Sequence, residues 1–161
     1  MAVRVERVEE PAQWAAADRL IRSYLESLPF TIDFQDLDRE LAALPAEYGP
    51  PDGAAYLAVE GNDGRVGADV AVGVVGVRRF ADADAELKRM YVEPSARGTG
   101  AGRALASAAV AAARGLGYRR LLLDTVASMT SAIAIYEELG FVAVDAYRHN
   151  PLPAARFFAL D

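Results

Sequence analysis

The chain has 161 residues, of which 53% are hydrophobic and 25% charged, proportions that indicate one globular domain spanning 1–161. It contains no cysteine, which excludes disulfides, thiolate metal sites and a cysteine nucleophile. The formal net charge of -6 disfavours a general nucleic-acid binder, because such proteins need a basic footprint for the phosphate backbone.

The cellular location can be predicted from the apolar runs and from the first ten residues. The longest apolar run, 70–77, is far too short to cross a bilayer, so no membrane partner is expected. The first ten residues carry several charges and lack the apolar core of a signal peptide. A cytoplasmic location follows as the default expectation.

The first third of the chain predicts a strand followed by two helices. Alternating apolar and charged residues over 3–8 are typical of an edge strand. Apolar side chains at helical spacing predict a helix over 13–28, which ends at Pro29. A shorter helix over 36–44 follows, and then a proline-containing loop over 48–53.

Three strands come next. The first two are predicted over 54–60 and 69–80, and a cluster of turn residues between them indicates a hairpin. Gly73 and Gly76 lie inside the second strand, where glycine indicates a bulge or a close approach of another group to the backbone. A third strand is predicted over 86–92.

The second half of the chain alternates helices with strands. Helices are predicted over 102–114 and 130–139, and strands over 119–126, 141–144 and 155–160. The resulting order is β-α-α-β-β-β-α-β-α-β-β. It predicts an α/β fold with a hairpin-rich first half and one β-α-β crossover.

A glycine-rich segment, Arg97-Gly98-Thr99-Gly100-Ala101-Gly102, lies between a predicted strand and a predicted helix. The start of a helix offers unpaired backbone N–H groups and a partial positive charge, and glycines let an anion approach closely. Arg97 and Arg103 could add charge-assisted contacts to a phosphate. An ordinary tight turn is the alternative interpretation. The segment lacks the lysine of a Walker A loop, and its glycine spacing differs from the dinucleotide fingerprint.

Three segments together resemble the GNAT acetyltransferase superfamily. They are Leu87-Lys88-Arg89-Met90-Tyr91-Val92-Glu93-Pro94, Arg97-Gly98-Thr99-Gly100-Ala101-Gly102-Arg103-Ala104-Leu105 and Ala132-Ile133-Ala134-Ile135-Tyr136-Glu137-Glu138-Leu139-Gly140-Phe141. The resemblance covers 54–144 well and the first fifty residues only in element order. It implies a GNAT-like mixed, mostly antiparallel twisted sheet flanked by helices.

The resemblance also implies acetyl-CoA as the co-substrate and no metal. The backbone of 90–92 would pair with the pantetheine arm and hold the thioester carbonyl, and the amides of 98–103 would hold the pyrophosphate. The strands 86–92 and 119–126 would splay apart to form the slot. Relatives often carry an asparagine where Met129 stands here, and Ser128 or Thr130 could replace its hydrogen bond or only cap the helix. The implied contacts are Met90, Tyr91, Val92, Arg97, Gly98, Thr99, Gly100, Ala101, Gly102, Arg103 and Ser128.

Three side chains are catalytic candidates under this resemblance. Tyr136 matches the family tyrosine that protonates the departing thiolate, although a helix tyrosine can also be simple core. Glu86 and Asp124 stand where family members place carboxylates, and either could take the amine proton directly or through water. Strand alternation predicts that Glu86 shares a face with Lys88, Met90 and Val92.

The acceptor pocket of relatives is often built from the first two helices and the late loop. The candidate wall residues are Phe30, Phe34, Tyr48, Tyr147 and Arg148. His149, the single histidine, is expected to be an exposed loop residue, which makes a metal site improbable.

The function that the resemblance implies is transfer of an acetyl group from acetyl-CoA to a primary amine by direct attack in a ternary complex. The acceptor, a small molecule or a peptide, stays open, although the negative net charge mildly favours a cationic one. A homodimer is also left open. The alternative is a non-catalytic acyl-CoA-binding regulatory module on the same scaffold.

Overall fold

The computed structural model describes residues 3–32, 36–61 and 69–161. Within these residues the strands are β1 (Val3–Arg7), β2 (Ala54–Glu60), β3 (Val70–Ala81), β4 (Asp84–Val92), β5 (Arg120–Val126), β6 (Val142–Val144) and β7 (Ala155–Leu160). The helices are α1 (Pro11–Ser27), α2 (Leu37–Ala42), α3 (Leu44–Tyr48), α4 (Ala101–Gly115) and α5 (Thr130–Glu138), with a 3-10 turn at Pro94–Ala96.

The described strands form a seven-stranded sheet in the order β1-β2-β3-β4-β5-β7-β6. β4 and β5 run parallel, and the other neighbouring pairs are antiparallel. The predicted α/β fold with a mixed, mostly antiparallel sheet is therefore confirmed. The sequence prediction missed α3, which it divided between a longer second helix and a loop.

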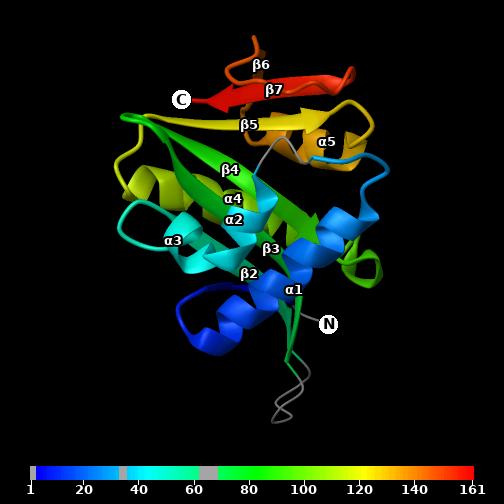
Figure 1. The fold of residues 1–161 in the computed structure, drawn as a ribbon. Helices are drawn as coiled ribbons and strands as arrows, with labels where there is room; N and C mark the ends of the chain where they lie inside the picture. Colours follow the sequence, from blue (N-terminus) through cyan, green and yellow to red (C-terminus); the bar gives the residue numbers. More distant parts are fainter. Residues whose placement is uncertain (1–2, 33–35, 62–68) are drawn as a thin grey trace.

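Helices cover both faces of the sheet (Figure 1). α1 and α3 pack with β2 on one face around Leu20, Leu57 and Val74, all buried. α4 packs on the other face with Leu105 in contact with the buried side of the same strands. α1 begins two residues earlier than predicted, because Pro11 suits a first helical position and the Gln13 side chain accepts hydrogen bonds from the chain before it.

A β-bulge interrupts β4 opposite the glycines of β3. Gly76 pairs with Lys88 and Val74 pairs with Tyr91, so β4 carries one extra residue over this stretch. Arg89 takes the strain of the bulge with a φ of 60°. The extra residue puts Met90 in the core beneath α4, with Leu87, whereas Tyr91 packs toward α1.

The bulge corrects one prediction and confirms another. Glu86 and Lys88 do not share a face with Met90 and Val92, because strict alternation fails across an inserted residue. The predicted bulge and the predicted close approach are both present at the β3 glycines. A Cβ on Gly76 would lie 2.6 Å from the ring of Tyr48.

β4 and β5 separate soon after they begin. Their pairing covers Asp84 with Arg120, Ala85 with Leu121 and Glu86 with Leu122, and it ends where the bulge of β4 follows. Figure 1 shows the two strands diverging from a shared end. This opening in the sheet positions the site described next.

Candidate active site

A groove of about 630 Å³ lies along the opened side of β4. Its walls come from the end of α1, the last residues of β4, the glycine-rich turn and the starts of α4 and α5. Most of the sequence-predicted cofactor contacts line it: Met90, Tyr91, Val92, Arg97, Gly98, Gly100, Ala101, Gly102, Arg103 and Ser128. Thr99 lies outside the lining and instead closes the turn, since its hydroxyl donates to the Ala96 carbonyl at 2.6 Å.

The glycine turn leads into α4 with an open backbone. Gly98 and Gly100 have φ values of 80° and 88°, a left-handed conformation that favours glycine, and a Cβ on either would meet open space. Gly100 is the N-cap of the 15-residue α4, whose first-turn N–H groups have no partner within the helix. The turn therefore presents donors and a partial positive charge to the groove.

The two arginines of the turn are held by neighbours. The Arg97 Nε donates to the Val92 carbonyl at 3.1 Å, and the Arg103 guanidinium pairs with Glu138 of α5. Gly102 lies close to α5, because a Cβ there would come 3.1 Å from the Ile135 side chain. α4 and α5 thus approach each other along one wall of the groove.

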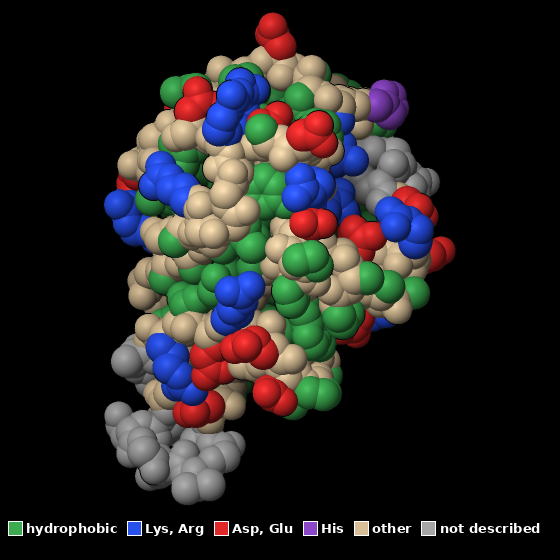
Figure 2. Space-filling model, turned by 90° about the vertical axis from the view of Figure 1, so that its left-hand side faces the viewer, with side chains coloured by type: hydrophobic (Ala, Val, Ile, Leu, Met, Phe, Trp, Pro, Cys, Tyr) green, Lys and Arg blue, Asp and Glu red, His purple; other side chains and the backbone are tan. Residues whose placement is uncertain are grey.

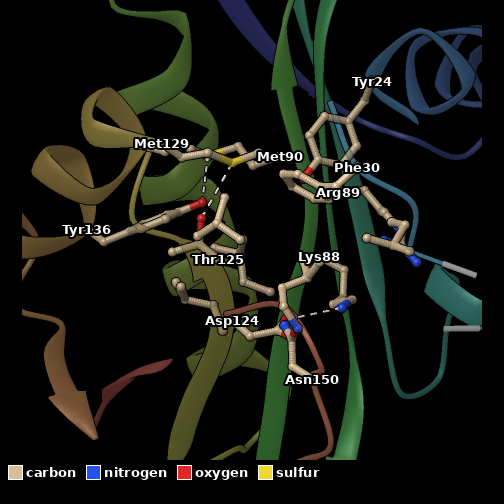
Figure 3. A pocket seen from close by; sticks show the side chains of 16 residues that line it. Tyr24, Phe30, Lys88, Arg89, Met90, Asp124, Thr125, Met129, Tyr136 and Asn150 are labelled. Atoms are coloured by element: carbon tan, nitrogen blue, oxygen red, sulfur yellow. Dashed lines mark hydrogen bonds and ion pairs between the residues drawn. The ribbon is translucent and has the colours of Figure 1, made fainter. Parts of the chain in front are cut away.

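An inner cavity of about 60 Å³ continues the groove between the separated strands. The two share wall residues Tyr24, Phe30, Met90, Met129 and Ala132. Tyr136, Asp124, Lys88 and Asn150 also line the inner cavity, and Figure 3 shows Tyr136 entering from α5 while Lys88 and Asp124 lie at the other end. The structure thus brings two of the three predicted catalytic residues to one cavity.

Tyr136 is 5% exposed, and its ring packs on Phe141 at 5.6 Å between ring centroids. Its hydroxyl donates to the thioether sulfur of Met90 at 3.9 Å, a weak contact. Burial raises the pKa of the Tyr136 phenol well above its ordinary value of 10. The phenol therefore keeps its proton at neutral pH.

Lys88 and Asp124 form a buried ion pair across the opening between β4 and β5. The Lys88 Nζ lies 3.4 Å from Asp124 Oδ1, and the two side chains are 4% and 3% exposed. Asn150 donates to the other Asp124 oxygen at 3.1 Å. Burial lowers the pKa of Lys88 to about 8, although the charges of Glu86 and Asp124 act to raise it.

Glu86 lies outside both the groove and the inner cavity, at 1% exposure. Its carboxylate accepts from Tyr147 at 2.8 Å, from Arg148 at 2.7 Å and from Arg78 at 3.2 Å. The predicted wall residues Tyr147 and Arg148 thus hold the loop before β7 onto β4 and line neither space. A carboxylate engaged by three donors is poorly placed to take a proton from a substrate.

The remaining residues predicted for the acceptor pocket lie in different environments. Phe30 lines both spaces, whereas Phe34 lies outside the described residues. Tyr48 is 1% exposed, packs against Gly76 and donates to Glu40 at 3.0 Å, so it belongs to the core and the prediction of a wall position was wrong. Ile32 and Leu152 supply apolar wall instead.

A second buried charge cluster braces the bulge. Arg89 donates to Glu40 through Nε at 2.8 Å and through a terminal nitrogen at 2.9 Å, and Glu40 is fully buried. Arg78 also reaches Glu40 at 3.3 Å. Burial would raise the pKa of Glu40, but the Arg89 and Arg78 contacts outweigh it and hold this pKa below 4.5.

Sequence reasoning missed Lys88, Asn150 and Tyr24 as wall residues of the inner cavity. One signal was available, because Lys88 is the single lysine of the chain and lies in a strand that reads as buried. No sequence signal marks Asn150, which reaches the cavity from the loop before β7.

Charged side chains of both signs lie on the described surface. On the face shown in Figure 2, basic and acidic side chains are interspersed, and His149 is exposed as predicted. Over the described ranges, no cluster of three His, Cys, Asp or Glu side chains could hold a metal ion. Among those same residues, helices of the length and apolarity needed to cross a membrane are absent.

Comparisons with known proteins match this geometry. The sequence profile described as the acetyltransferase (GNAT) family matches residues 17–141. An uncharacterised N-acetyltransferase of Schizosaccharomyces pombe is 30% identical over 160 residues, which cover 99% of this chain and 94% of that protein. An uncharacterised N-acetyltransferase of Escherichia coli is 36% identical over 135 residues, covering 81% of this chain and 77% of that protein.

Solved structures share the fold. The crystal structure of a GNAT-family acetyltransferase from Staphylococcus aureus superposes with a TM-score of 0.77 at 18% sequence identity. The match covers 98% of each chain. The arrangement of strands and helices is thus that of these acetyltransferases along almost the whole chain.

Proposed function

We propose, since this chain belongs to the GNAT family of acetyltransferases, that it transfers an acetyl group from acetyl-CoA to a primary amine. The family and the relatives named N-acetyltransferase make the chain an acyltransferase enzyme. We also propose acetyl-CoA as the donor, direct attack of the amine as the mechanism and a single domain over residues 1–161. The observation that carries it is the continuity of the groove at the glycine turn with the inner cavity that holds Tyr136.

The groove supports a coenzyme A donor over its whole length. The pyrophosphate would bind at the start of α4, where unpaired N–H groups face the groove. The pantetheine arm would lie along Met90–Val92, because this part of β4 no longer pairs with β5 and can accept an extended partner. Ser128 and Thr130 both line the opposite wall and could supply the hydrogen bond that Met129 cannot, since a methionine does not replace an asparagine amide.

The chemistry needs a nucleophile, a proton acceptor and a proton donor. With no cysteine to form an acyl-enzyme, the amine nitrogen would attack the thioester carbon directly as the carbon–sulfur bond breaks. Tyr136 would give its proton to the leaving sulfur. We propose Asp124 rather than Glu86 to take the amine proton, directly or through water, because Asp124 faces the inner cavity.

The test is release of coenzyme A thiol from acetyl-CoA with a panel of primary amines. Tyr136→Phe should lower kcat by ~10²-fold or more, the usual contribution of a general acid, while the Kd for acetyl-CoA stays within about threefold. Tyr118→Phe is the matched control, because that hydroxyl donates to the Asp52 carbonyl, away from the groove. Equal kcat values for Tyr136→Phe and the wild type would refute the general-acid role.

The alternative of a non-catalytic acyl-CoA-binding module makes a different prediction. Such a module would bind acetyl-CoA and release no thiol with any amine. The placement of a protonated Tyr136 in the inner cavity favours an enzyme. A homodimer and a cytoplasmic location stay predictions.

A further inference from the structure

We propose that Glu86 is a positioning residue for the amine acceptor, because it fixes the loop 145–154 against β4. This loop, called the anchored loop below, carries Asn150 and Leu152 into the wall of the inner cavity. The inference rests on the proposed function, since it concerns the acceptor side of the same site. It gives Glu86 an anchoring role in place of the proton-accepting role that the sequence predicted.

The carboxylate of Glu86 joins the anchored loop to the sheet. It is 1% exposed, and a buried charge of this kind is stable only when protein groups compensate it. Its Oε2 accepts from the Tyr147 hydroxyl at 2.8 Å and from Arg148 at 2.7 Å. Its Oε1 accepts from Arg78 of β3 at 3.2 Å. One oxygen therefore holds the loop and the other holds the neighbouring strand.

The ring of Tyr147 gives the anchored loop a second attachment. It packs against Phe80 and Phe157 with ring centroids 5.0 Å and 5.5 Å away, and the rings are nearly perpendicular, at 84° and 82°. Edge-to-face contacts on two sides favour a single orientation of the ring. The Tyr147 hydroxyl is thus kept directed at Glu86, and the loop is fixed at two consecutive residues, Tyr147 and Arg148.

Asn150 transmits this anchoring to the inner cavity. Its Nδ2 donates to Asp124 Oδ2 at 3.1 Å, and its Oδ1 accepts from the Leu152 backbone N–H at 3.0 Å. A side-chain amide that bonds at both ends fixes the turn of the loop and one oxygen of the carboxylate together. The position of Asp124, the proposed proton acceptor, therefore depends on where the loop is held.

The far end of the anchored loop is attached independently. The Ala127 N–H donates to the Ala154 carbonyl at 2.9 Å, and β7 then pairs with β5. Loss of the Glu86 contacts would therefore free the middle of the loop and leave β7 in the sheet. The outer groove would keep its walls, because these come from α1, β4, the glycine turn and the starts of α4 and α5. The expected consequence is weaker acceptor binding with an intact donor site.

The first experiment removes the loop side of the anchor with Arg148→Met, which leaves Glu86 its contacts with Arg78 and Tyr147. The acceptor probe is the fastest amine of a fixed panel of amino acids, spermidine, tyramine and a tripeptide with a free N-terminus. The acceptor KM should rise about tenfold, the loss expected for one hydrogen bond to a charged group. The kcat and the Kd for acetyl-CoA should stay within about threefold, because a saturating acceptor selects the docked loop.

Two comparisons separate anchoring from other roles. Arg148→Lys should recover part of the KM loss, since it keeps the positive charge beside Glu86. Arg120→Met is the matched control, because it removes an exposed ion pair with Asp161 elsewhere on the sheet. Hydrogen exchange of the peptide that spans 145–154 should accelerate in Arg148→Met and stay unchanged in the control, a readout that does not depend on activity.

A double-mutant cycle tests whether the anchor acts through Asn150. Asn150→Ala should raise the acceptor KM by itself. Arg148→Met/Asn150→Ala should then show little further loss, because the loop no longer has its contact with Asp124 to position.

The outcomes separate this inference from the proposed function. An unchanged acceptor KM in Arg148→Met, additive losses in the cycle, or an equal loss of acetyl-CoA affinity would overturn the positioning role and leave the acetyltransferase proposal standing. A fall in kcat of ~10²-fold in Glu86→Gln at unchanged KM would overturn it as well, since that is the pattern of a lost general base. Release of no thiol by the wild type with any amine would overturn both. A KM increase that the cycle assigns to Asn150 would support both.

Discussion

Glu40→Gln is expected to destabilise the protein by about 3–5 kcal/mol, the range seen when one partner of a buried ion pair is removed. The carboxylate accepts two hydrogen bonds from Arg89 and one each from Arg78 and Tyr48. Glutamine keeps the shape but has one acceptor oxygen, and its NH₂ group would face a guanidinium. The change leaves two partly or fully buried arginines without their shared anion.

This loss is a large share of the 5–15 kcal/mol that typically separates folded from unfolded domains. Equilibrium unfolding in urea measures it, and with a slope of ~1–3 kcal/mol/M the midpoint should fall by roughly 2 M. Asp18→Asn is the control, because Asp18 pairs with Arg22 on the exposed surface of α1 and such pairs contribute about 0.5 kcal/mol. A loss below about 1 kcal/mol for Glu40→Gln would refute the reasoning.

The pH dependence provides a second check. The folded pKa of Glu40 is below 4.5, so the unfolded carboxyl binds its proton first as the pH falls. The stability that Glu40 contributes is complete above about pH 4.5 and is lost as the pH falls through the lower folded pKa. The difference between wild type and Glu40→Gln should therefore shrink on acidification. A constant difference down to acidic pH would contradict the lowered pKa.

Gly100→Glu should abolish acetyl-CoA binding in calorimetry, because a carboxylate would face the pyrophosphate at the start of α4; Gly100→Ala, which carries the same strain at positive φ, should still bind. Normal binding by Gly100→Glu would show that the donor lies elsewhere. Lys88 should make wild-type stability rise by about 3 kcal/mol between pH 8 and 10.5, since the unfolded lysine keeps a proton that the folded one loses near 8. Lys88→Met should lack that rise, and an equal rise in both proteins would contradict it. Among the described residues, the charged groups that act on Lys88 include Glu86, Asp124, Arg89 and Arg148.

The features that sequence reasoning predicted well are local ones. Glycines at 98 and 100 adopt the positive φ values that let the turn open toward the groove, and the following apolar spacing predicts α4 within one residue. Strand and helix order likewise follows from short-range periodicity. For these elements, residues near in sequence carry the determining interactions.

The features that it missed depend on distant partners. Alternation cannot detect an inserted residue at Arg89, because the bulge is stabilised by Glu40 from α2. The engagement of Glu86 likewise depends on Tyr147 and Arg148, about sixty positions later. A strand carboxylate looks the same in sequence whether it faces a cavity or anchors a loop, so only the folded packing separates Glu86 from Asp124.

The absence of cysteine and the single, buried Lys88 leave few side chains that thiol-selective or amine-selective reagents can modify. With no cysteine, the protein itself contributes no thiol background when released coenzyme A is measured. With one lysine, an amine-selective reagent has a single side-chain target, and that target lines the inner cavity. The rate at which such a reagent modifies Lys88, read from the mass of the peptide that contains this residue, would therefore report how often the cavity opens and how well a bound ligand closes it.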